Sequence, residues 1–306
     1  MSDFPAVDAM DRPWYEPPLF TGDAEAALPL LAYDGGQVGA VTVRAGSVAA
    51  ETCRPYDNCN DTFALWSHRA TDLCFMAVAD GVGRSEDAGR AARAAARVAV
   101  TAFRAKCGGL LDPRGSHLAD RVREAIADVA VTLDELARRR LASKGGQGGP
   151  KVAGGHGDYR TTLVVAALVT RVPPGGRVPA VVARVGDSTA WRLHSGSLAP
   201  VFPGRAEESA PTAALPGNFA ALETQTLHLG DGEVLALTTD GLARDGRDEH
   251  VRAFVGRLWA APPTPLEFLA SLAVRRNDRD DDRAAAVAWL GHWESEPEQS
   301  AHEGPG

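Results

Sequence analysis

Long runs of apolar residues in this chain repeatedly stop at an aspartate. The run Leu73–Ala79 is unbroken and leads straight into Asp80 and Gly81. Two later runs stop in a similar way, one at Asp187 and the other at Asp240. Unbroken apolar runs of this length are typical of strands that are buried on both faces. The pattern therefore predicts three buried strands with a carboxylate at the end of each.

The rest of the pattern predicts further strands and two pairs of helices. Strands are expected from near Val38 onward and at Thr62–Trp66, Thr161–Thr170, Pro179–Asp187, Thr189–Leu193, Ser197–Val201, Leu222–Leu229, Glu233–Thr239 and Ala284–Leu290. Helices are expected at Ala88–Cys107, Ser116–Ser143, Glu249–Ala260 and Pro265–Arg275. Ser85 is the predicted N-cap of the first helix, and the acidic residues that follow it suit the helix dipole.

The order of these elements indicates a fold class. Two helices follow the early strands, and a series of strands with short connections comes next, which is not the alternation of a parallel doubly wound sheet. Short connections favour antiparallel neighbours. We therefore predict an α+β fold in which two packed, mostly antiparallel sheets are flanked by helix pairs. The three buried strands then have apolar neighbours on both faces.

The two ends of the chain differ from its middle. Residues 1–36 are rich in proline and acidic residues and are predicted to be a disordered leader, the alternative being an aromatic strap that packs on the domain or on a partner. One domain is expected at 37–291. Residues 292–306 are predicted to be a disordered tail.

Composition narrows the classes of function. A net charge of −8 argues against non-specific nucleic-acid binding, because a phosphate-binding surface needs an excess of cations. The four cysteines have no regular spacing, which favours a reducing compartment over a disulfide scaffold. We see no apolar run of membrane-spanning length and no basic-then-apolar secretion signal, so we expect a cytoplasmic protein that does not bind membranes.

Four aspartates are expected to meet at one rim of the fold. Asp80 and Asp240 end strands there, while Asp61 and Asp281 precede strands. Carboxylates this close repel one another unless cations lie between them, and a set of oxygen ligands without His or Cys selects Mg²⁺ or Mn²⁺. Gly81 lets the backbone approach, so its carbonyl can bind the same ion as Asp80. Two such ions bridge a water and lower its pKa, which implies metal-assisted hydrolysis at a phosphoryl centre.

A single Asp-Gly pair is usually no more than a turn, so the order of several motifs is more specific. The set reads CNDTFAL, FMAVADGVG, YRTTLVVAAL, VARVGDSTAW, VLALTTDGL and DDDRAAAVAWL. From about Val38 to Leu290 it resembles the type 2C metal-dependent (PPM) serine/threonine protein phosphatases, and most of all their bacterial subgroup. The resemblance implies an α-β-β-α sandwich and hydrolysis of phosphoserine and phosphothreonine in proteins by a water bridged between two Mg or Mn ions.

The same resemblance assigns roles to individual residues. Asp80 would bridge the two ions, the Gly81 carbonyl would bind the first, and Asp240 and Asp281 would bind the second. Asp187 would help to hold a third, weaker ion. The implied metal residues are Asp61, Asp80, Gly81, Asp187, Asp240 and Asp281, and the implied catalytic residues are Asp80, Asp61 and Arg54. The implied partners are a phosphoprotein substrate and a serine/threonine kinase counterpart, and we expect a monomer.

Three departures from the family pattern keep alternatives open. Asn60 replaces a glutamate, and Arg54 lies two residues further from the motif than the phosphate-binding arginine of the family, so Arg84 is a second candidate for that role. In the last motif Asp281 aligns best, with Asp280 and Asp282 as alternatives. The alternative function is a catalytically weak or inactive phosphatase-like module that binds phosphoproteins or a kinase. A two-metal nuclease is disfavoured by the acidic charge.

Overall fold

The structure is a computed structural model of the 306-residue chain. It describes residues 31–50, 59–68, 71–83, 85–107, 117–143, 157–171, 176–202, 212–245, 249–273 and 281–291. The predicted leader up to residue 30, residues 144–156 and the predicted tail from residue 292 lie outside the described residues.

The described strands form two sheets, and every pair of neighbouring strands is antiparallel. The six-stranded sheet has the order β1 (Leu31–Val38), β2 (Val41–Val48), β11 (Arg283–Leu290), β10 (Val234–Thr238), β7 (Thr189–His194) and β8 (Ser197–Pro200). The five-stranded sheet has the order β3 (Asp61–His68), β4 (Leu73–Gly81), β5 (Thr161–Val169), β6 (Arg177–Val185) and β9 (Glu223–Gly230).

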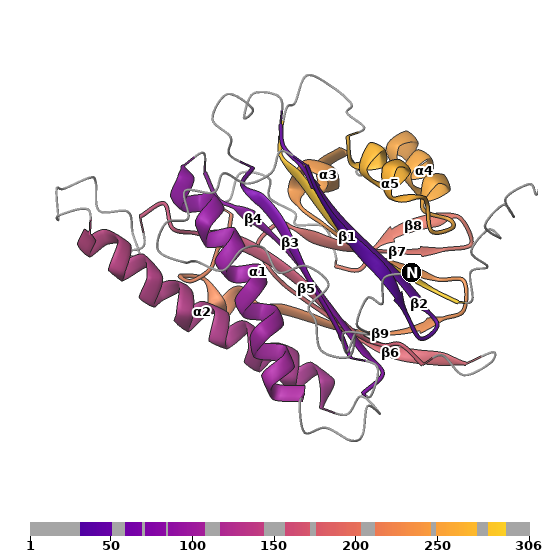
Figure 1. Cartoon of the computed structure of the whole chain (residues 1–306), viewed down its shortest axis with the longest axis horizontal. Coiled ribbons are helices and arrows are strands. Elements are labelled where there is room, and N and C mark those ends of the chain that lie inside the picture. The colour runs from indigo at the N-terminus through magenta and orange to yellow at the C-terminus, as the bar shows by residue number, and fades with distance from the viewer. Residues whose placement is uncertain are drawn as a thin grey trace, which may run out of the picture.

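Helices cover the outer face of each sheet (Figure 1). α1 (Glu86–Cys107) and α2 (Leu118–Ser143) lie against the five-stranded sheet. α4 (Glu249–Leu258) and α5 (Pro265–Leu272) lie against the six-stranded sheet, and the short α3 (Asp240–Asp245) lies next to β10 and β11. The predicted α+β sandwich is therefore confirmed, with the layers helix, sheet, sheet and helix.

Strand β10 shows why the apolar runs are continuous. Leu235 and Leu237 belong to the core between the two sheets, whereas Val234 and Ala236 belong to the core under α4 and α5. Because successive side chains of a strand point to opposite faces, a strand between two apolar layers needs apolar residues at every position. The predicted burial on both faces is confirmed for this strand.

Helix α1 is held close to its sheet by small side chains. The Ser85 hydroxyl accepts a hydrogen bond from the Ala88 amide at 3.3 Å, as predicted for an N-cap. Buried alanines fill the face toward the sheet, so the helix approaches closely enough for Phe103 to stack on Phe75 of β4 with ring centroids 4.2 Å apart. Aromatic stacking at this distance adds to the burial energy of both rings.

The second helix layer rests on three tryptophans and Phe268. Trp191, Trp259 and Trp289 are all buried in the core under these helices. Trp259 donates its indole N–H to the Ser271 hydroxyl at 2.9 Å, and Trp289 donates to the Trp259 carbonyl at 2.7 Å. These hydrogen bonds satisfy the polar atoms of large side chains in an apolar layer.

The folded part begins earlier than predicted. The boundary at residue 37 is wrong, because β1 already begins at Leu31 and pairs with β2 along its whole length. Its Asp-Gly-Gly sequence has low strand propensity, and pairing with β2 overrides it. The two strands join in a tight turn at Gly39, whose φ of +57° and contact with Thr170 both require glycine.

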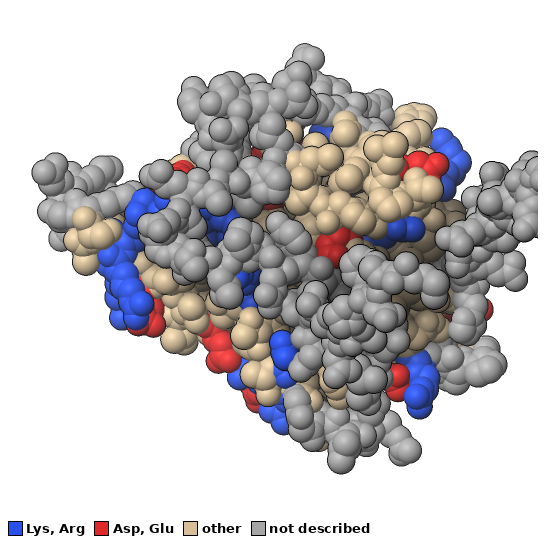
Figure 2. All heavy atoms as spheres, in the orientation of Figure 1, with Lys and Arg blue, Asp and Glu red and all other residues tan. Residues whose placement is uncertain are grey.

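The surface carries both signs of charge along α2. Figure 2 shows Lys and Arg atoms alternating with Asp and Glu atoms along the edge that this helix forms. Arg138 pairs with Asp134, and Arg139 pairs with Glu135, each one turn earlier on the helix. Such pairs support an exposed helix.

None of the helices that the structure describes is long and apolar enough to cross a membrane.

Candidate metal centre

Strand pairing brings the first two aspartates together. Asp61 is the first residue of β3 and lies directly opposite Asp80 near the end of β4. Asp61 is 2% exposed and Asp80 is partly buried. Like charges at directly opposite positions of an antiparallel pair destabilise a sheet, so this arrangement carries a cost that stability alone does not explain.

Two further aspartates reach the same place from other strands. Asp187 follows β6 of the five-stranded sheet, and Asp240 follows β10 of the six-stranded sheet as the first residue of α3. One carboxylate oxygen from each of Asp80, Asp187 and Asp240 lies within 4.8 Å of the other two. The rim where both sheets end therefore gathers carboxylates from each of them.

The structure separates the roles of the neighbours Asp281 and Asp282. Asp282 is 4% exposed and accepts two backbone hydrogen bonds of 2.6 Å, from the Ala50 amide and the Asn60 amide. The Asp281 side chain is 50% exposed and lies 3.6 Å from Arg244 at the edge of the cluster. Asp282 thus fastens the segments around β2 and β3, and Asp281 is the better placed ligand of the two. Asp280 lies outside the described residues.

Three of the carboxyl groups, those of Asp61, Asp80 and Asp240, hold their protons more tightly than usual. Burial, followed by the charge of Asp240, raises the pKa of Asp80 to about 8. Burial, followed by the charge of Asp187, raises the pKa of Asp240 to about 6. Burial, together with Asp80 and Asp282, raises the pKa of Asp61 well above its ordinary value. Ionising all of these groups at neutral pH therefore requires compensating positive charge.

The donor set fits hard divalent cations. Asp61 Oδ2 and Asp187 Oδ1 are buried and have no hydrogen-bond partner among the described residues. Unsatisfied buried carboxylate oxygens are rare and call for an explanation, and a cation supplies one. Oxygen atoms from several carboxylates, without a nitrogen or sulfur ligand beside them in this cluster of described residues, match Mg²⁺ or Mn²⁺.

Two glycines allow the close approaches that build the centre. A Cβ on Gly81 would lie 2.5 Å from the backbone of Ala88, in the first turn of α1. A Cβ on Gly241 would lie 2.3 Å from the Asp282 carbonyl oxygen. Both positions therefore exclude a side chain, and the glycines after Asp80 and Asp240 have a structural reason beyond turn formation.

Hydroxyl groups fix the backbone around the carboxylates. The Thr162 and Ser188 hydroxyls form a buried hydrogen bond of 2.7 Å, which ties the segment after β6 to β5. The Thr161 hydroxyl donates to the Asp80 carbonyl at 2.7 Å, and the Thr212 hydroxyl donates to Asp187 Oδ2 at 3.0 Å. The strand sequence alone did not reveal these contacts, since threonine is common in strands for other reasons.

The structure shows what Asn60 contacts at the position where the family has a glutamate. The Asn60 side chain donates to the Gly83 carbonyl at 2.9 Å, and its oxygen lies against Gly89 of α1. Arg54 and Arg84 lie outside the described residues. Arg244 was missed by the sequence analysis: it forms an ion pair with Asp240, four residues earlier on α3. The signal for this contact is the spacing of four residues, which brings two side chains together only in a helix. No helix was predicted directly after Asp240.

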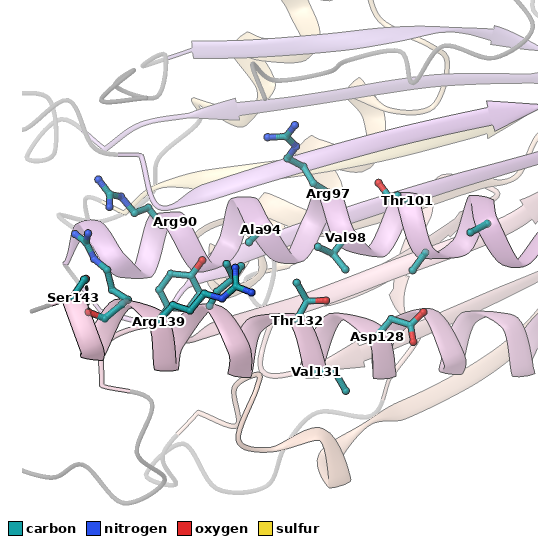
Figure 3. A pocket seen from close by; sticks show the side chains of 15 residues that line it. Arg90, Ala94, Arg97, Val98, Thr101, Asp128, Val131, Thr132, Arg139 and Ser143 are labelled. Carbon is teal, nitrogen blue, oxygen red and sulfur yellow. Dashed lines mark hydrogen bonds between the residues drawn. The ribbon is translucent and has the colours of Figure 1, made fainter. Parts of the chain in front are cut away.

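A spacious groove lies elsewhere, between the two helices that cover the five-stranded sheet. It has a volume of about 1060 Å³ and runs between α1 and α2, from Arg90 and Ser143 at one end to Thr101 and Asp128 at the other (Figure 3). None of the clustered aspartates lines it. The candidate chemistry of this chain therefore belongs to the rim and not to this groove.

The structure thus brings together five of the predicted side chains, Asp61, Asp80, Asp187, Asp240 and Asp281, and places Gly81 beside Asp80. Their roles as metal ligands stay a prediction. Arg54, the third predicted catalytic residue, is outside the described part of the chain.

Comparisons with solved structures identify the same architecture. Mycobacterium tuberculosis serine/threonine phosphatase PstP has a TM-score of 0.52 and 16% identity, over 86% of this chain and 98% of that one. A structure of the PstP catalytic domain contains two manganese ions. PppA of Pseudomonas aeruginosa has a TM-score of 0.53 and 18% identity, over 85% and 96%. RsbX, in complex with magnesium, has a TM-score of 0.54 and 15% identity, over 85% and 100%.

The sequence comparisons give the family. No curated protein matches the chain. The family description protein phosphatase 2C matches residues 53–274, which is well over half of the 306 residues. This match covers the segments that carry Asp61, Asp80, Asp187 and Asp240, and the two-sheet sandwich agrees with it. The chain belongs to the protein phosphatase 2C family.

Proposed function

We propose that this protein is a Mg²⁺- or Mn²⁺-dependent phosphatase that removes phosphate from phosphoserine and phosphothreonine in proteins. The observation that carries the proposal is the convergence of Asp80, Asp187 and Asp240 within 4.8 Å at the rim of a protein phosphatase 2C domain. Asp61 and Asp281 border the same cluster. Carboxylates placed so close together that they repel one another are typical of a functional site.

The residues have distinct proposed tasks. Asp80 and the Gly81 carbonyl would hold one ion, Asp240 and Asp281 the second, and Asp187 a third, weaker one. When bound, hard divalent ions supply the Lewis acidity that activates a water for attack on phosphorus and that offsets the charge of the phosphate. Asp61 is next to Asp80, with a buried oxygen that has no partner among the described residues, so it can bind an ion or orient a water.

The structural relatives support the choice of ion and substrate. PstP is a serine/threonine phosphatase with two manganese ions in one structure, and RsbX has been solved with magnesium. By analogy we propose a phosphoprotein substrate and a serine/threonine kinase counterpart for this chain. We also propose a monomer that works in the cytoplasm.

Phosphate release tests the proposal directly. The purified full chain is incubated with a phosphothreonine peptide, with and without Mn²⁺, beside Asp80→Asn and a control variant, Asp120→Asn, at an exposed position in the first turn of α2. We expect Mn²⁺-dependent release from the wild type and the control, and a loss of at least about a hundredfold in Asp80→Asn. A wild type that releases no phosphate would contradict the proposal.

A second candidate is a phosphatase-like module that binds phosphoproteins or a kinase with little or no turnover. The observation in its favour is Asn60, a neutral side chain that is engaged with Gly83 where the family has a glutamate. Such a module could still bind ions at the other carboxylates. Stabilisation of the wild type by Mn²⁺ without phosphate release from any phosphopeptide would favour it over the enzyme.

A further inference from the structure

A phosphate group that approaches this rim meets several carboxylates, so its binding requires cations from the protein as well as metal ions. Arginine is the side chain best suited to this task, because its planar guanidinium offers several donors to a phosphate. The sequence points to Arg54 and Arg84, which lie outside the described residues. The described part of the rim offers another arginine.

Arg244 contacts the carboxylates that would coordinate an ion. It pairs with Asp240 one turn earlier on α3, and its Nη1 lies 3.6 Å from Asp281 Oδ2. The guanidinium therefore touches the two aspartates that are proposed to hold the same ion. Its side chain is 44% exposed, so the donors that these contacts leave are open to solvent.

A second described arginine next to these aspartates is placed differently. Arg283 follows Asp282 directly, but it is 2% exposed and donates to the Leu272 carbonyl at the end of α5. A side chain that is buried in this way does not reach a substrate on the surface. Among the described residues, Arg244 thus combines contact with the cluster and exposure to solvent.

We propose that Arg244 binds the substrate phosphate. The sequence has no arginine at the position where the family pattern places the phosphate-binding one. This inference rests on the proposed phosphatase function. Without ions, the guanidinium neutralises Asp240 and Asp281. With a divalent ion held by these carboxylates, the guanidinium would no longer be needed as their counterion, and its donors would be available to the phosphate oxygens.

A purely structural role for Arg244 makes a different prediction. If the side chain served only as a counterion, its removal would strengthen Mg²⁺ binding by removing a competitor and would leave phosphate binding unchanged. If it binds phosphate, Arg244→Ala weakens phosphate binding. Lysine keeps the charge but loses the paired donor geometry, so Arg244→Lys should lie between the wild type and Arg244→Ala.

The test measures binding and not turnover. Isothermal titration with inorganic phosphate is carried out on the full chain with saturating Mg²⁺, for the wild type, Arg244→Ala, Arg244→Lys and the control Arg257→Ala, an exposed arginine of α4. Mg²⁺ binding to each variant is measured separately, as the rise in its melting temperature with increasing Mg²⁺ concentration. We expect the Kd for phosphate to rise about tenfold in Arg244→Ala, as for one lost charged hydrogen bond, and to stay unchanged in Arg257→Ala.

The outcomes distinguish a failure of the proposed role of Arg244 from a failure of the proposed function. A wild type with no response to Mg²⁺ or Mn²⁺ contradicts the proposed function itself. A wild type that binds both Mg²⁺ and phosphate, with an unchanged phosphate Kd in Arg244→Ala, overturns the role of Arg244. Arg54→Ala and Arg84→Ala are measured in parallel, and loss of phosphate binding in either of them but not in Arg244→Ala also overturns it.

Discussion

Asp61 and Asp80 lie directly opposite each other on the antiparallel strands β3 and β4, with their carboxyl groups among buried surroundings at the rim of the sandwich. Burial, followed by the charges of neighbouring aspartates, raises the pKa of both side chains. This pair costs stability in the absence of cations, and the predictions on pH and on divalent ions rest on that cost.

The stability of the metal-free protein should fall as the pH rises. An acid whose folded pKa is raised contributes stability that is fully present below its unfolded pKa, near 4, and that is lost as the pH passes the folded pKa. That folded pKa is about 6 for Asp240 and about 8 for Asp80. Between pH 6.5 and 8.5 we expect a loss on the order of 1 kcal/mol, measured by urea unfolding in EDTA.

Asp80→Asn provides the control for this pH dependence. The amide does not ionise, so the variant should be more stable than the metal-free wild type at pH 8.5, and its unfolding free energy should change less between pH 6.5 and 8.5. Asp34, whose pKa burial raises to about 6, titrates mostly below this window. Equal slopes for the wild type and Asp80→Asn would show that Asp80 does not carry the effect.

Divalent ions should reverse this loss of stability. We expect Mn²⁺ to raise the melting temperature of the wild type, and to raise it more at pH 8.5 than at pH 6.5, because ions bind the ionised carboxylates and compete with protons. Asp240→Asn should lose most of the response, whereas the control Asp120→Asn on α2 should keep it. A response that is the same in both variants would place the ions elsewhere.

The neighbours Asp281 and Asp282 should give opposite results. Asp282→Ala removes the acceptor of two backbone amides, at Ala50 and Asn60, and should destabilise the metal-free protein by about 2–4 kcal/mol. Asp281→Ala removes a half-exposed carboxylate and should change that stability little while weakening the Mn²⁺ response. Thermal melts with and without Mn²⁺ measure both quantities. The reverse result would reassign the ligand to Asp282.

The buried hydroxyl pair should couple Thr162 to Ser188. We expect Ser188→Ala and Thr162→Val each to cost about 1 kcal/mol, because each leaves the other hydroxyl without its 2.7 Å partner. In the double variant the second change should cost less than it does alone, which a double-mutant cycle in urea measures. Strict additivity would argue against a direct interaction. Ser143→Ala, at the exposed end of α2, is the control.

Much of the fold could be predicted because burial leaves a local record in the sequence. The apolar runs at β4 and β10 are continuous because each strand lies between two apolar layers. The N-cap at Ser85 and the regular spacing of apolar residues in α2 depend on neighbours within one or two turns. β1 and α3 were missed, since their residues have weak propensities and contacts with distant segments stabilise them.

The same division applies to the candidate site. The sequence by itself determined which aspartates end strands, and the order of the motifs indicated the family, because both are properties of short segments. Only the tertiary structure decided that Asp80, Asp187 and Asp240 lie within 4.8 Å, that Asp282 holds two backbone amides and that Arg244 contacts Asp240 and Asp281. Distances between residues from different strands depend on how two sheets pack, and no local pattern contains that information.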